Sequence, residues 1–120
     1  MILNVAMRAL VVVVLIAAVS AAAPRKRSVE MAITLPNGAV ARAAAPEDEG
    51  VMVTLADGTR FGFVPALSRD DSAIVVSIWD VDAQPMKKLG TVRVAVGGDE
   101  VRSDTSPVFG VRITRVVKPR

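Results

Sequence analysis

The hydrophobic pattern of the chain is that of β-strands, and its most apolar stretch covers residues 74–81. This stretch, IVVSIWDV, is apolar on both faces, is rich in β-branched residues and holds the only tryptophan, Trp79. Such a pattern is typical of a strand that is buried on both sides near the middle of a sheet. We therefore predict a strand over residues 73–81, with the other strands packed around it.

A first hairpin is predicted near the start of this domain. Apolar and other residues alternate over 29–35, which indicates a strand with one buried face. The Asn-Gly dipeptide at 37–38 follows and is a strong signal for a two-residue hairpin turn. Such a turn places Leu35 opposite Val40, in a second strand over residues 39–44.

A second hairpin is predicted after Glu47, Asp48 and Glu49, which we call the acidic loop. Residues 51–55 alternate again and are followed by Ala-Asp-Gly. A three-residue loop with a left-handed glycine gathers the apolar side chains on one face, so we prefer it to a two-residue turn. This register pairs Phe61 with Val53 and Phe63 with Val51.

The remaining strands follow Trp79 along the chain. Residues 91–96 alternate, and the glycine-rich turn at 97–100 lets residues 101–103 pair back onto that strand. The last strand covers 108–117, where the apolar positions change phase at Arg115, which indicates a bulge.

This series of short strands and turns, with no helical period, predicts an all-β fold. We expect a small antiparallel β-sandwich of about seven to eight strands over residues 29–118. An immunoglobulin-like or related Greek-key sandwich is the preferred form, although the chain has no cysteine for the usual disulfide.

The first 23 residues have the layout of a secretory signal peptide. Arg8 precedes an apolar run over residues 9–19, and small residues at 20–23 provide a cleavage site. The run is shorter than the roughly twenty residues that a membrane-spanning helix needs. We therefore predict a cleaved signal peptide at 1–23 and a secreted or periplasmic protein.

A basic, disordered leader is predicted between the signal peptide and the domain, at residues 24–28. Its Arg25, Lys26 and Arg27 outnumber the single Arg8 that precedes the apolar run. Because positive charges favour the cytoplasmic side of a membrane segment, an uncleaved N-terminal anchor is the alternative. In that case the chain contacts a membrane only through this segment.

The composition argues against catalysis and against nucleic-acid binding. Cys, His and Tyr are absent, which excludes thiol chemistry, cysteine-based zinc sites and the usual general base at neutral pH. We therefore predict that the protein is not an enzyme. The net charge is only +3 and aromatic residues make up 3% of the chain, so no nucleic-acid partner is expected.

Residues 74–96 resemble one stretch of C2 domains. In that family a strand ends in Trp-Asp-x-Asp, here residues 79–82, and Leu-Gly opens the next strand, here at 89–90. The resemblance implies that Asp80 and Asp82 are calcium ligands, in keeping with the preference of Ca²⁺ for clustered carboxylate oxygens. The same two residues also suit turns at the end of a strand, which need no metal.

Together these observations predict a secreted or periplasmic, non-catalytic module that binds a protein or a cell-envelope polymer. A sheet edge or the end loops would form the binding surface. The alternatives are a C2-like module that binds calcium or a membrane surface, and a membrane-anchored β domain with an uncleaved N-terminal segment.

Overall fold

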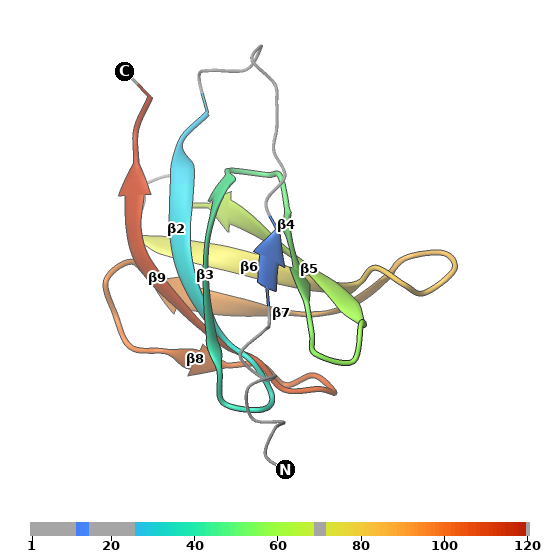
Figure 1. Ribbon diagram of the computed structural model, residues 1–120. Helices are drawn as coiled ribbons and strands as arrows, with labels where there is room; N and C mark the ends of the chain where they lie inside the picture. Colours follow the sequence, from blue (N-terminus) through green and yellow to red (C-terminus); the bar gives the residue numbers. More distant parts are fainter. Residues whose placement is uncertain (1–11, 15–25, 69–71, 120) are drawn as a thin grey trace.

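Alternating strands joined by tight turns form two antiparallel sheets, described for residues 12–14, 26–68 and 72–119 in this computed structural model (Figure 1). The first sheet contains, in spatial order, β1 (Val12–Val14), β4 (Val51–Thr54), β5 (Arg60–Leu67), β6 (Ala73–Asp80) and β7 (Lys87–Ala95). The second contains β3 (Val40–Pro46), β2 (Ser28–Thr34), β9 (Gly110–Val117) and β8 (Val101–Arg102). The described residues include no helix, so the all-β prediction is confirmed.

The two sheets enclose one hydrophobic core. In Figure 1 the strands β2, β3 and β9 run across the direction of β6 and β7. The rings of Phe61 and Phe63, from β5, each meet the ring of Phe109 edge-on, at centroid distances of 5.1 and 5.2 Å. Since Phe109 lies just before β9, this aromatic group joins the two sheets.

The predicted register of the second hairpin is confirmed. Phe61 pairs with Val53 and Phe63 with Val51. Gly58 has a positive φ of 92°, as the three-residue loop requires. The bulge in the last strand is also confirmed, because the pairing of β2 with β9 shifts register next to Arg115.

The predicted register of the first hairpin is wrong by one residue. Val40 pairs with Thr34, and the amide of Leu35 donates to the carbonyl of Ala39 at 2.8 Å. The loop therefore has three residues, 36–38, with Gly38 at a φ of 92°. A one-residue shift turns every side chain of a strand over. Val40 consequently faces outward and is 55% exposed.

The predicted pairing of residues 101–103 is also wrong. β8 pairs with β9 of the second sheet, not with the strand that precedes it. The chain changes sheets at Val96, which forms a parallel bridge to Ile113, and the next amide, of Gly97, donates to the carbonyl of Ile113 at 2.9 Å. This crossing carries the following residues away from β7.

The strand around Trp79 is fully buried on one face only. Ile74, Val76 and Ile78 are 0% exposed and face the core, whereas Val75 and Trp79 on the opposite face are half-buried. The prediction of burial on both sides is therefore wrong. In the described part of the chain no second sheet covers the outer face, although Val75 and Trp79 on it are apolar.

The N-terminal region is described only in part. Val12–Val14 form β1, which pairs antiparallel with β4. The rest of the predicted signal peptide at 1–23 lies outside the described residues, as does the start of the predicted leader. In the leader, Lys26 forms an ion pair with Glu49 at 3.1 Å and Arg27 one with Glu47 at 2.6 Å. Where the chain is described, no helix is long and apolar enough to span a membrane.

Candidate functional site

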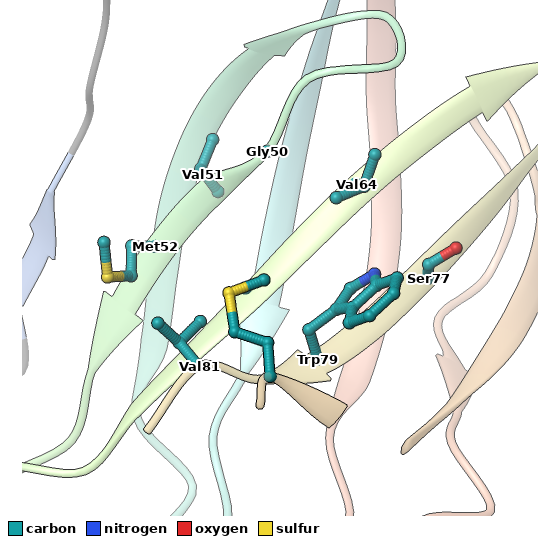
Figure 2. A pocket seen from close by; sticks show the side chains of 9 residues that line it. Gly50, Val51, Met52, Val64, Ser77, Trp79 and Val81 are labelled. Atoms are coloured by element: carbon teal, nitrogen blue, oxygen red, sulfur yellow. The ribbon is translucent and has the colours of Figure 1, made fainter. Parts of the chain in front are cut away.

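The outer face of the first sheet carries an apolar hollow where a solvent-facing sheet is normally polar. Three side chains from neighbouring strands, Met52 on β4, Val64 on β5 and Trp79 on β6, surround it (Figure 2). Its volume is about 530 Å³, which lies within the range of small-ligand sites. The full lining is Gly50, Val51, Met52, Gly62, Val64, Ser77, Trp79, Val81 and Met86.

We call this hollow the Trp79 hollow, and Gly62 forms its floor. Gly62 lies between Met52 and Trp79 in a continuous row across three strands. A Cβ atom at Gly62 would lie 3.3 Å from a methyl group of Val81 and 3.8 Å from the Cβ of Trp79. A side chain at Gly62 would crowd Val81, so the glycine lets Val81 and Trp79 lie close over the backbone of β5.

The lining chemistry suits binding and offers nothing for acid–base catalysis. Ser77 is the one lining residue with a polar side chain besides the indole N–H of Trp79, and none of the lining residues titrates. Met86, in the loop after β6, is 53% exposed. An exposed methionine at the rim of an apolar hollow is a side chain that adapts readily to a ligand.

Two lysines lie next to the hollow on β7. Lys88 pairs in register with Trp79, and Lys87 pairs with Asp80, across a bulge that follows Ile78. Both lysines are exposed. A partner that fills the hollow therefore meets positive charge along one side, which favours acidic residues flanking its apolar segment.

Asp80 and Asp82, the predicted calcium ligands, both take part in the turn after β6. The backbone amide of Asp82 donates to Oδ1 of Asp80 at 3.1 Å, which is the hydrogen bond of an Asx turn. The two oxygens of Asp82 accept hydrogen bonds from Arg60, one from its backbone amide at 2.9 Å and one from its Nε at 2.8 Å. These bonds from Arg60 hold the pKa of the Asp82 carboxyl below its ordinary value.

Calcium binding remains a prediction that rests on these two residues. A cation at Asp82 would compete with the guanidinium of Arg60, which lies 2.7 Å from Oδ1. The described residues contain no group of three or more His, Cys, Asp or Glu side chains that could hold a metal ion. The acidic pair at 70–71 precedes β6, at the other end of the strand from Asp80, and lies outside the described residues.

The acidic loop after β3 is occupied by the chain's own basic leader. Arg27 donates from Nε and from its backbone amide to Oε1 of Glu47, at 2.6 and 3.2 Å. The side-chain hydrogen bond from Arg27 lowers the pKa of the Glu47 carboxyl, in opposition to the desolvation that raises it. This contact fixes where the chain enters β2.

The hollow was missed from the sequence, although its signal is present there. The apolar residues on both faces of residues 74–81 are consistent with two-sided burial or with one buried face and one binding face. Gly62, opposite Trp79, is the sequence feature that points to this face, because a glycine between two phenylalanines of a strand marks a place where another group approaches the backbone closely.

In fold and site, the chain is an all-β protein of two antiparallel sheets with an apolar hollow on the outer face of one. No family model matches this chain, and no curated protein or solved structure matches it either.

Proposed function

We propose that this protein is an exported, non-catalytic binding module that holds an apolar segment of a protein partner in the Trp79 hollow. The observation that carries the proposal is the apolar lining of the hollow, on a sheet face that no second sheet of the described chain covers. Exposed apolar surface of this kind is typical of interaction sites. The absence of titratable lining residues supports binding without chemistry.

The finer description of the fold belongs to the same proposal. We propose a small β-sandwich with Greek-key character, supported by the return of the last strand, β9, to lie beside the first strand of its sheet, β2. Export rests on the signal-peptide pattern of residues 1–23. A protein is preferred over an envelope polymer as partner, because the hollow offers few hydrogen-bonding groups for sugars.

The neutral dye Nile red tests whether the hollow accepts an apolar ligand. The fluorescence of the dye is titrated with the wild-type chain, with Met86→Glu and with Val40→Glu. The two exchanged side chains are 53% and 55% exposed, so neither variant loses core packing. Only Met86 lines the hollow.

We expect Met86→Glu to weaken dye binding about tenfold, because the ligand would have to desolvate a carboxylate, whereas Val40→Glu leaves it unchanged. Equal binding by both variants would place the dye elsewhere and contradict the proposal. The proposal is also contradicted if the fluorescence of Nile red with the wild-type chain is no higher than in buffer.

A further inference from the structure

We propose that the side of β4 that faces away from β5 is a strand-accepting edge, and that its physiological occupant is an extended, uncharged, β-branched segment of a partner protein. We call this side the free side of β4, because only β1 pairs with it in the described chain. The inference rests on the proposed function and deepens it, because it states how the partner's backbone is held. The chain's own Val12–Val14 shows the chemistry of such an occupant, since these three valines pair antiparallel with β4 as β1.

The hydrogen-bonding groups that β4 offers can be assigned from its hairpin. The amide of Leu55 donates to Thr59 at 2.8 Å, so the backbone groups of Leu55 point toward β5. Backbone groups alternate in direction along a strand, so those of Val53 also point toward β5, whereas those of Thr54 and Met52 point to the free side. Thr54 and Met52 are the residues that pair with Val12 and Val14.

In the described chain β1 lies at this end of the first sheet, so β4 becomes an edge strand only when β1 is removed. It would then differ from the other edge strands in the described part of the chain. β7 carries Lys87 and Lys88, β3 carries Arg42 and ends at Pro46, and β8 has only two residues, one of them Arg102. Charges, prolines and short length are the usual means by which an edge resists pairing with another chain. The β4 sequence, VMVT, has no charge and no proline, so its edge is suited to accept a strand.

The edge and the Trp79 hollow are continuous through Met52. Its side chain lines the hollow, while its backbone faces the free side of β4. A residue paired with Met52 projects on the same face of the sheet, with Cβ atoms about 5 Å apart. One partner segment can therefore bond to β4 through its backbone and extend the apolar lining with alternate side chains.

Removal of the predicted signal peptide would vacate this edge. β1 lies within residues 1–23, so the unprocessed chain fills the edge itself and the processed chain presents it. In this arrangement, processing controls when the partner site opens. The two states have the same β4 residues and differ only in what covers them.

Amide hydrogen exchange, followed by NMR on the full chain, tests the occupancy of the edge. In the wild type we expect the amides of Met52 and Thr54 to be protected by β1. In the double variant Val12→Pro, Val14→Pro they should exchange about tenfold faster, because β1 loses both donors that face β4. The amide of Val53, bonded to β5, stays protected and reports that the fold is intact. Val13→Pro is the control, since that amide faces away from β4.

Two synthetic peptides of the same sequence test strand addition to the opened edge. Each has the sequence of residues 10–15, LVVVVL, with flanking glutamates for solubility. One is unmodified, and the other carries N-methyl groups on all four valines. Methylation of alternate valines would leave one unmodified side that a one-residue slip could present to β4, so all four are methylated. We expect the unmodified peptide alone to restore the protection of the Met52 and Thr54 amides in the double variant.

Three results would overturn the inference. Met52 and Thr54 amides that exchange freely in the wild type while Val53 is protected would show that β1 does not pair with β4. Equal effects of the two peptides would exclude backbone pairing. Protection that rises with protein concentration, without peptide, would assign the edge to a second copy of the chain. If the Nile red experiment gives the expected result and the exchange and peptide experiments do not, only the edge proposal is wrong. If the exchange and peptide experiments succeed and the Nile red experiment fails, the edge proposal stands and the binding role of the Trp79 hollow is wrong.

Discussion

At the scale of single residues, Phe109 is the side chain on which the packing of the two sheets depends most. It is 0% exposed and contacts the rings of both Phe61 and Phe63. Ser103, the one buried polar residue in the described part of the chain, fixes its backbone. The Ser103 hydroxyl accepts from the Phe109 amide at 2.9 Å, and the Ser103 amide donates to the Phe109 carbonyl at 2.7 Å.

We expect Phe109→Ala to lower the free energy of unfolding by about 3–5 kcal/mol, because it removes a buried ring and leaves a cavity between the sheets. Val108→Ala is the control: its side chain is 39% exposed, so a change within about 0.5 kcal/mol is expected. Urea denaturation followed by the fluorescence of Trp79 measures both. Similar losses in the two variants would show that Phe109 does not link the sheets.

At the scale of elements, the two hairpins use one loop design. Both have the pattern Thr-Leu-x-[Asn/Asp]-Gly, at residues 34–38 and 54–58. In each loop the glycine amide donates to the leucine carbonyl at 2.9 Å and the glycine has a φ of 92°. The register of the first hairpin could therefore have been predicted by analogy with the second. The Asn-Gly dipeptide favours a two-residue turn. Here it occupies the last two positions of a three-residue loop, and Ala41 faces the core in place of Val40.

Substitution of Gly58 tests the loop design. A Cβ atom there would have no neighbour within 4 Å, so any cost comes from backbone conformation alone. We expect Gly58→Ala to destabilise the fold by about 1–2 kcal/mol, and Gly58→Asn by clearly less, because asparagine adopts the left-handed region more readily. Thermal unfolding of both variants is the measurement. An alanine variant as stable as the wild type would mean that the loop adopts another geometry in solution.

At the scale of the whole molecule, the chain reaches stability by packing alone. It contains no cysteine, so no disulfide stabilises the two sheets, and one shared core must do so. The ion pairs of Lys26 and Arg27 with the acidic loop hold the N-terminal end of β2 beside β3. The segment before them contains both the predicted signal peptide and β1, so its fate decides whether the β4 edge is covered.

Measuring the intact mass of the chain recovered from each cell compartment shows whether the predicted signal peptide is removed. We expect a soluble exported form that begins between residues 22 and 25, because small residues occupy positions 20–23. A full-length, membrane-bound form would instead support the uncleaved anchor, with the basic residues 25–27 on the cytoplasmic side. In that form β1 stays covalently attached to the domain, and the edge remains covered.

The sequence by itself determined the approximate positions of β2 to β9, most turns and the inward face of the second hairpin, but not β1, which lies in the predicted signal peptide. These features depend on neighbours along the chain, through the two-residue period of a strand and the conformations that glycine allows. The placement of Phe61 and Phe63 in the core followed from this information. So did the bulge at Arg115, where the apolar phase changes.

Only the tertiary structure decided which strands meet and which apolar faces are covered. β8 pairs with β9, and no second sheet of the described chain covers the outer face of β6, which forms a wall of the Trp79 hollow. Both depend on contacts between residues far apart in the sequence, which no local period encodes. The pattern of apolar residues in the sequence is the same whether a second layer of the protein buries them or a partner does. Only the packing of the whole chain decides between these two cases.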